Sequence, residues 1–281
     1  MGLGYATIMY DGVALERAFA SVSACRYDGI EVGLGKIETV GPDAVADWLD
    51  KYDLDLYCVM GHWIESEAAA ESLADSAELV SDLGAEFLAI LPPQRHRNED
   101  ATVESWLRTV SEAAVDAGIT PILHHHGGTH IEQGAEVRAF LDAIDGLELL
   151  FDTAHWYPYG DNFPKGDVTD GIERFADDLA YVHLKDVDPI KEFAANRDAL
   201  SEPKPHLDNV INYFRSFTDL GNGTIDFEGV QDALTAVGYD GHYTIEIENQ
   251  ISKPLVHAKE NFDYWQSLGG PMFENQPVHS D

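Results

Sequence analysis

Eight short β-type runs, each followed by a longer amphipathic run, are the feature that most constrains the fold of this chain. Hydrophobic and β-branched residues fill the short runs, and apolar residues recur at helical spacing in the longer ones. Strands with little polar alternation are typical of parallel sheets that helices cover on both faces. We therefore expect strands at residues 3–9, 29–34, 54–61, 86–91, 119–125, 147–153, 179–185 and 242–248.

The helices between these strands follow from the spacing of the apolar residues. In one of them, Leu73, Ala77 and Val80 lie on one face and acidic residues fill the other. By the same reasoning we expect helices at residues 13–25, 42–52, 65–83, 99–117, 133–145, 168–178, 226–238 and 254–268. Eight strand–helix units in series predict an α/β fold, a single (β/α)8 TIM barrel domain that spans residues 1–281.

One long connection interrupts this alternation, from Asp186 to Gly223, and it carries its own helical patch, "HLDNVINYFRSF". A connection of that length in a compact domain usually carries function, so we predict a loop or lid insertion at about residues 186–223. A doubly wound open sheet is the alternative architecture. It is less favoured because the first strand is not followed by the Gly-rich turn G-x-G-x-x-G that such nucleotide-binding folds carry.

The charge balance excludes some partners. The chain has 17 Lys and Arg against 51 Asp and Glu, a formal net charge of −34, so no nucleic acid or anionic membrane is expected to bind. The acids are spread along the chain, which favours a halophilic protein whose charge is screened by salt. The sequence begins without a basic, apolar leader and has no apolar run of membrane-spanning length. We expect a cytoplasmic protein, and a homo-oligomer is compatible with the sequence.

Polar residues gather where the predicted strands end, which is where the active sites of such barrels lie. A single residue of this kind is usually structural. Carboxylates and imidazoles that converge from strands five to eight, however, would repel and desolvate one another unless a cation holds them. The sequence therefore predicts a metal site at this rim. The strand-end residues are Glu31, His62, Gln94, the His124–His126 trio, Asp152, His155, His183, Lys185, Asp186, Glu246 and Glu248.

The residue types indicate which metal would bind. Mixed oxygen and nitrogen ligands suit Mn²⁺, Co²⁺ or Zn²⁺, with Mg²⁺ less favoured. Glu246 and Glu248 are two residues apart on a strand and face the same side, so one can bind metal while the other works as acid or base. Asp152 and His155 lie three apart across a strand exit, where one can point at a metal and the other at a substrate oxygen.

The stretch "ILHHHGGTHIE" (residues 122–132) places four of the 12 histidines within seven residues. Adjacent imidazoles are costly to bury unless something binds them. With "YDGIEVG", "DTAH", "VHLKD", "GNGTIDFEGV" and "GYDGHYTIEIE" in this order, nearly the whole chain resembles the xylose isomerase-like TIM barrel superfamily of sugar isomerases, epimerases and dehydratases. Within it, "HHHGGT" resembles the strand-5 motif of inosose dehydratases, which remove water from a keto-inositol with a divalent metal such as Mn²⁺ or Co²⁺.

The resemblance also implies a ligand set of Glu, Asp, His and Glu at the ends of strands five to eight. Asp152, His183 and Glu246 match the last three. His124 stands at the position of the first, where an imidazole can coordinate in place of the carboxylate. Glu132, eight residues later, is the alternative strand-5 ligand. Because epimerases of the superfamily use that Glu as a base, its absence disfavours a two-carboxylate epimerase mechanism.

These inferences together favour a metal-dependent lyase that acts on a polyhydroxy ketone through an enolate, most closely an inosose dehydratase. A cation at the rim would acidify the proton α to the carbonyl and stabilise the enolate. Glu248 is the predicted acid or base, and His125, His155 or Lys185 the acid that protonates the leaving hydroxyl. The polyol or ketosugar substrate would contact Glu31, His62, Trp63, Trp156 and Asn249.

Three alternatives remain open at this point. The first is a ketose or hydroxypyruvate isomerase or epimerase. The second is a metal hydrolase like the apurinic-site endonucleases, which would need a basic DNA-tracking face that 17 scattered basic residues do not supply. The third is a non-catalytic sugar-binding barrel, which the crowded titratable rim disfavours.

Overall fold

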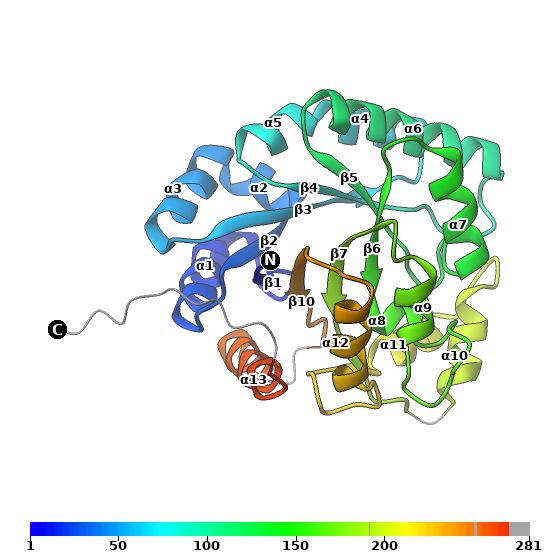
Figure 1. Cartoon of the computed structure of the whole chain (residues 1–281). Helices are drawn as coiled ribbons and strands as arrows, with labels where there is room; N and C mark the ends of the chain where they lie inside the picture. The colour runs from blue at the N-terminus through cyan, green and yellow to red at the C-terminus, as the bar shows by residue number, and fades with distance from the viewer. Residues whose placement is uncertain (191, 250–251, 270–281) are drawn as a thin grey trace.

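Eight parallel strands close into a barrel in the computed structural model, which describes residues 1–190, 192–249 and 252–269. The strands follow one another around the barrel in the order β1-β10-β7-β6-β5-β4-β3-β2. Figure 1 shows the helices outside this ring of strands. All eight predicted strands are present, so the TIM barrel expectation is confirmed. The strands are β1 (Leu3–Ala6), β2 (Gly29–Gly33), β3 (Asp55–Trp63), β4 (Phe87–Leu91), β5 (Thr120–His124), β6 (Glu148–Asp152), β7 (Leu179–Leu184) and β10 (His242–Ile245).

Two hydrophobic layers stabilise the barrel, because successive side chains of a strand point to opposite faces. In β4, Leu88 and Ile90 belong to the large core between strands and helices. Phe87 and Ala89 belong to a smaller cluster that also includes Tyr181. The inner cluster fills the barrel interior with apolar side chains, and the polar residues are left at the C-terminal ends of the strands.

The helices follow the predicted amphipathic runs. They are α1 (Leu15–Ala24), α3 (Pro42–Tyr52), α4 (Glu67–Asp75), α5 (Ala77–Asp82), α6 (Asp100–Asp116), α7 (Gly134–Ala143), α9 (Thr169–Arg174), α12 (Phe227–Ala236) and α13 (Pro254–Ser267). The helix expected over residues 65–83 is divided at Ser76 into α4 and α5. Outside the connection after β7, three short elements were not predicted: a 3₁₀ turn at Gly12–Ala14, α2 (Leu34–Val40) and α8 (Thr153–Trp156).

The connection after β7 is a helical excursion. Its ends form a small antiparallel pair, β8 (Asp186–Val187) with β9 (Phe217–Thr218). The predicted helical patch forms α11 (Leu207–Phe214), and α10 (Phe193–Leu200), which the sequence analysis did not anticipate, packs beside it. Residues 193–218 are named the α10–α11 segment here. The Asp186 carboxylate anchors the connection by accepting backbone hydrogen bonds from Val187, Gly221, Gly223 and Ile225.

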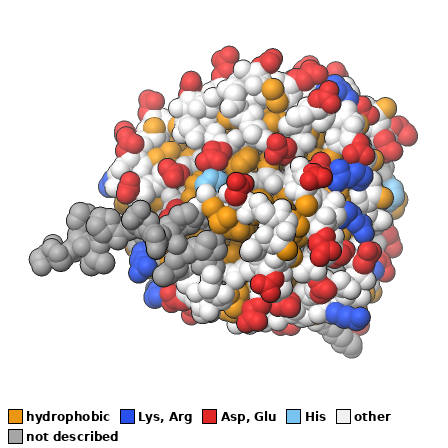
Figure 2. All heavy atoms as spheres, viewed as in Figure 1, with side chains coloured by type: hydrophobic (Ala, Val, Ile, Leu, Met, Phe, Trp, Pro, Cys, Tyr) orange, Lys and Arg blue, Asp and Glu red, His pale blue; other side chains and the backbone are white. Residues whose placement is uncertain are grey.

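Acidic side chains are scattered over the surface in Figure 2, and Lys or Arg are few on that face. Across residues 1–190, 192–249 and 252–269, no helix combines the length and the apolar composition needed to cross a bilayer. The single domain expected over residues 1–281 also includes residues 191, 250–251 and 270–281, which lie outside the described part of the chain.

Candidate active site

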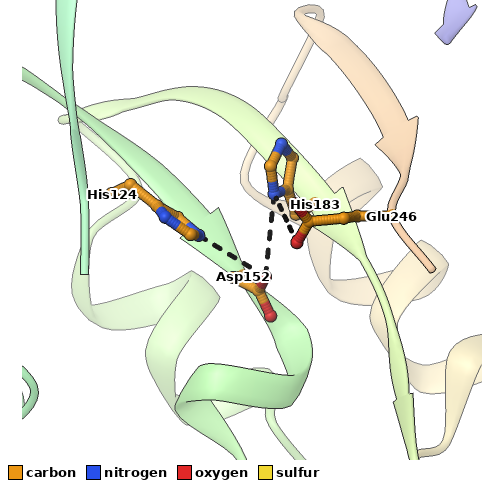
Figure 3. A group of neighbouring side chains, drawn as sticks. All are labelled: His124, Asp152, His183 and Glu246. Carbon is orange, nitrogen blue, oxygen red and sulfur yellow. Dashed lines mark ion pairs between the residues drawn. The ribbon is translucent and has the colours of Figure 1, made fainter. Parts of the chain in front are cut away.

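Four side chains from neighbouring strands meet at the mouth of the barrel (Figure 3). His124 ends β5, Asp152 ends β6, His183 lies near the end of β7, and Glu246 directly follows β10. Each offers one ligand atom, and these four atoms lie within 4.8 Å of one another. All four residues are buried. The topology therefore gathers groups that are up to 122 positions apart in the chain, because β5, β6, β7 and β10 are adjacent in the barrel.

Four polar atoms of this cluster make no hydrogen bond in the described part of the chain. Both ring nitrogens of His124, Oδ2 of Asp152 and Nδ1 of His183 are buried and make no hydrogen bond within the described residues. Asp152 Oδ2 lies 3.6 Å from His124 Nε2 and 3.7 Å from His183 Nδ1. Burying such atoms without partners is costly. Lone pairs that converge from two imidazoles and two carboxylates are a donor set that fits a divalent cation.

Local structure fixes the orientation of two of these groups. Asp152 is the N-cap of α8, and its Oδ1 accepts hydrogen bonds from the amides of Ala154 at 2.8 Å and His155 at 2.9 Å. Its Oδ2 is thereby directed into the cluster. Glu31 reaches His183 from β2, and its Oε2 lies 2.8 Å from His183 Nε2. This contact leaves His183 Nδ1 facing the cluster. A carboxylate behind a histidine ligand is the usual way in which proteins orient such a ring.

A buried lysine balances the charge of the cluster. Lys185 Nζ forms an ion pair with Asp152 Oδ2 at 3.0 Å and hydrogen bonds with Glu246 and Glu248. It also lies 3.3 Å from His155 Nε2. Burial disfavours the ammonium, but the three carboxylates raise the pKa of Lys185 well above its usual value. Burial raises the pKa of Glu248 to about 7, against the opposing effect of Lys185. Lys185 and Glu248 can therefore hold protons next to the four clustered ligands.

A cavity of about 380 Å³ opens onto this cluster. That volume falls within the range of small-molecule sites, about 300–1,000 Å³. Its wall combines apolar and titratable side chains: Ile8, Met60, Trp63, Leu91 and Phe214 on one hand, and His124, His126, Glu246 and Glu248 on the other. Of these, Glu248 and His126 are the titratable side chains that lie outside the clustered ligand set. Lys185 and His155 lie behind this wall, in contact with it.

The structure brings together most of the residues that the sequence predicts for catalysis and metal binding. His124, Asp152, His183 and Glu246 form the cluster, and Lys185, His155 and Glu248 are in contact beside it. Trp63, predicted to contact substrate, lines the cavity.

Two predicted site residues are directed into the packing around the barrel instead. The His125 ring packs against Phe151 and Trp156, and its Nε2 accepts the Asp152 amide at 3.1 Å. Because side chains alternate along a strand, His125 faces away from the cluster that His124 faces. Trp156 is fully buried, and its Nε1 donates to Asp170. Neither residue lines the cavity, so the geometry does not support the expected acid and substrate-wall roles.

Three other predicted substrate contacts lie elsewhere. His62 is 45% exposed and pairs with Glu38 at 3.4 Å. The Asn249 side-chain amide donates to the carbonyls of Phe214 and Phe217, which ties the segment after β10 to the α10–α11 segment. Glu31 lies behind His183 as described above, which makes it an orienting partner for a ligand.

The alternative strand-5 ligand, Glu132, belongs to a separate network. Its Oε2 accepts hydrogen bonds from the Gly128 amide at 2.7 Å and Tyr159 Oη at 3.1 Å. Its Oε1 accepts from Ser201 Oγ at 2.8 Å and lies 3.3 Å from Arg95. With both oxygens occupied, Glu132 is absent from the cluster, and His124 takes the strand-5 position.

The sequence analysis gave no site role to five lining residues, the apolar Ile8, Met60 and Leu91 and the rings of His126 and Phe214. His126 lines the cavity, and its ring lies 3.8 Å from that of His155. Strand alternation could have found it, since residues 124 and 126 share a face. Phe214 reaches the cavity from α11. No local signal marks Phe214, because its position depends on how the α10–α11 segment folds over the barrel.

Known proteins resemble this chain in sequence and in fold. An inosose dehydratase of Klebsiella pneumoniae subsp. pneumoniae is 33% identical over 177 residues, which is 59% of this chain and 56% of that protein. The match thus spans little more than half the length of that relative. The D-allulose 3-epimerase structure of Methylomonas sp. superposes with a TM-score of 0.72 at 18% identity and covers 95% of this chain and 98% of that one. The zinc-bound IOLI protein superposes with a TM-score of 0.69 at 13% identity, over 96% of each chain.

The two structural likenesses show the shared fold alone. The family model of the xylose isomerase-like TIM barrel matches residues 19–268, which is most of the chain. With a closed eight-stranded barrel and the polar cluster at its mouth, this protein belongs to the xylose isomerase-like TIM barrel family.

Proposed function

We propose that this protein is a divalent-metal-dependent dehydratase that acts on a keto-inositol or a similar polyhydroxy ketone. The observation that carries the proposal is the position of Glu248, which lines the same cavity as two of the four clustered ligands, His124 and Glu246. Elimination of water from such a ketone needs a site that polarises the carbonyl and a group that moves a proton beside it. The resemblance to inosose dehydratases supports the same substrate class.

His124, Asp152, His183 and Glu246 would hold the metal, and a divalent cation there would polarise the ketone and stabilise the negative charge of an enolate. Two observations support a metal of the Mn²⁺, Co²⁺ or Zn²⁺ type. The IOLI structure carries zinc, and buried ring nitrogens of His124 and His183 make no hydrogen bond in the described part of this chain. A small, uncharged polyol fits a cavity whose wall is partly apolar and partly carboxylate and imidazole.

The residues of this chain account for the proton transfers. Glu248 faces the cavity and takes the proton from the carbon next to the carbonyl. The β-hydroxyl then leaves with one proton as water, and that proton comes from the group formed by Glu248, Lys185 and His155, whose polar atoms are in contact. One C–H and one C–O bond break, and a carbon–carbon double bond forms. The product is an α-hydroxy enone, which tautomerises to a 1,2-diketone.

The test is to strip the protein with EDTA, add back Mn²⁺, Co²⁺ or Zn²⁺, and assay a keto-inositol in saturating salt. The 1,2-diketone is trapped with o-phenylenediamine as a quinoxaline and quantified by absorbance. We expect turnover that EDTA abolishes and metal restores. Glu248→Gln should lower kcat by about 100-fold or more, the usual contribution of a proton-transfer residue. Metal-restored protein that releases no diketone would refute the proposal.

The identity of the product, determined for the same reaction run in D₂O, separates elimination from isomerisation or epimerisation, because tautomerisation of the enone also takes up solvent deuterium. An epimerase or isomerase would return solvent deuterium to carbon and yield an isomeric ketose without a diketone. If metal addition raises the melting temperature while no ketone turns over, the non-catalytic sugar-binding alternative is favoured instead.

A further inference from the structure

A second chamber adjoins the cavity described above. It has a volume of about 250 Å³ and shares Trp63, His126 and Phe214 with the cavity at the metal-ligand cluster. The His126 ring lies 5.0 Å from Trp63 and 5.7 Å from Phe214, so these three rings lie along the border that the two spaces share. We name the second space the outer chamber. Its own wall includes Glu65, Gln94 and Val210.

The lining of the outer chamber suits a neutral ligand with one apolar face. Trp63 lines the chamber and remains 41% exposed, so a face of its ring is accessible to a ligand. Glu65 and Gln94 supply polar groups to the same lining. The Glu65 Oε1 accepts a hydrogen bond from the backbone amide of Gln94 at 3.1 Å. In the described part of the chain, the Gln94 carboxamide makes no hydrogen bond, so its donors and acceptor are free for a ligand.

The charge of the chamber lining disfavours phosphorylated ligands. None of the described residues that line the outer chamber is Lys or Arg, and Glu65 lines it. Arg97 does not line the chamber, and its Nη1 is already paired with Glu65 Oε2 at 3.5 Å. A phosphate or carboxylate would therefore meet a carboxylate whose cation is occupied, in a chain of net charge −34. Hydroxyl groups, in contrast, can bond both to the carboxylate and to the free carboxamide. A sugar ring has this combination of an apolar C–H face and a hydroxyl edge.

We propose that the outer chamber binds a neutral sugar ring that is linked to the polyol ring in the inner cavity, so that the preferred substrate is a glycosylated polyol ketone. This inference rests on the proposed function for the identity of the inner ring. Trp63, His126 and Phe214, which line both spaces, would contact the linkage between the two rings. The inner cavity alone is large enough for the polyol, so the outer chamber adds selectivity for the longer ligand.

The experiment measures binding, which does not depend on turnover. Isothermal titration calorimetry on the full, Mn²⁺-loaded chain compares myo-inositol with a galactosyl-myo-inositol. We expect the galactosyl derivative to bind at least about tenfold more tightly, a difference of about 1.4 kcal/mol. Equal affinities, or no binding of either probe, would overturn the inference. Loss of keto-inositol dehydration with the tenfold preference intact would refute the proposed function and leave the outer chamber supported.

Matched variants on one helix locate the effect. Val210 lines the outer chamber and not the inner cavity, so Val210→Trp should fill it and remove the tenfold preference. Ile211, the next residue of α11, lines neither space and is 38% exposed, so Ile211→Trp should retain it. Gln94→Leu provides a second variant that leaves α11 unchanged and replaces the carboxamide with an apolar side chain. If both Val210→Trp and Gln94→Leu keep the preference in folded protein, the outer chamber is not the site.

Discussion

Asp152 combines two roles in one carboxylate, and a single isosteric substitution separates them. Its Oδ1 caps α8 by accepting the amides of Ala154 and His155, while its Oδ2 points into the metal-ligand cluster. In Asp152→Asn the amide oxygen can still cap the helix, since Asn and Asp are about equally good N-caps. The second position becomes an NH₂ group, which cannot bind a cation and faces the Lys185 ammonium.

The structure sets the size of the effect on stability. Asp152 Oδ2 lies 3.0 Å from Lys185 Nζ, and Lys185 keeps its contacts with Glu246 and Glu248 after the substitution. Loss of one charged partner should lower the free energy of unfolding of the metal-free protein by about 1.5–3 kcal/mol. Asp152→Ala should cost about 1 kcal/mol more, because it also removes the helix cap.

The effect on metal binding should be larger. Removing an outer hydrogen-bond partner of a metal ligand already costs about 10–100-fold in affinity. Removing the carboxylate ligand itself should therefore weaken Mn²⁺ binding by more than about 100-fold. The assays are a Mn²⁺ titration against a competing chelator, and urea unfolding of the EDTA-treated protein.

The control is Asp226→Asn, which changes the N-cap of α12, where the side chain accepts the Gly229 amide at 3.1 Å. Asp226 does not belong to the metal-ligand cluster. It should leave metal affinity and stability within a few tenths of a kcal/mol of the parent. Wild-type Mn²⁺ affinity in Asp152→Asn would refute the assignment of the cluster as a metal site. Equal stability of Asp152→Asn and Asp152→Ala would refute the capping argument.

Three further predictions follow from single contacts. Glu31→Gln removes the carboxylate behind His183 and should weaken Mn²⁺ binding by about 10–100-fold with the barrel intact, as a chelator titration would show; unchanged affinity would contradict an orienting role. Asn249→Ala deletes two hydrogen bonds to the α10–α11 segment, worth about 1–3 kcal/mol together, so amide exchange in that segment should accelerate about 10–100-fold, and uniform exchange would count against it. Finally, the free energy of unfolding should rise with salt, because self-repulsion of a −34 chain is screened as the Debye length falls from about 30 Å at 0.01 M to about 3 Å at 1 M; a flat dependence would argue against a surface adapted to high salt.

The candidate ligands were predictable because strand ends converge in a barrel. His124, Asp152, His183 and Glu246 each lie at or just after the end of a predicted strand, and the closed topology brings such ends together. Strand alternation further separates His124 from His125. The same rule applied one residue further would have included His126 in the cavity wall.

Other parts of the site depend on contacts that no local pattern encodes. Glu31 and His183 are 152 positions apart, and their pairing depends on which strands face one another across the barrel. Asn249 and Trp156 have the residue types of substrate contacts, yet their surroundings make one an anchor of the α10–α11 segment and the other a packing residue.

The sequence by itself determined the eight-stranded barrel and the strand ends from which the ligands come, because hydrophobic periodicity and strand alternation are local properties of the chain. The tertiary structure alone decided that Lys185 lies between three carboxylates, that Glu132 is held away from the cluster, and that α11 supplies Phe214 to both cavities. These outcomes depend on the adjacency of segments distant in sequence and on competition among partners for the same polar atoms, which only the folded arrangement sets.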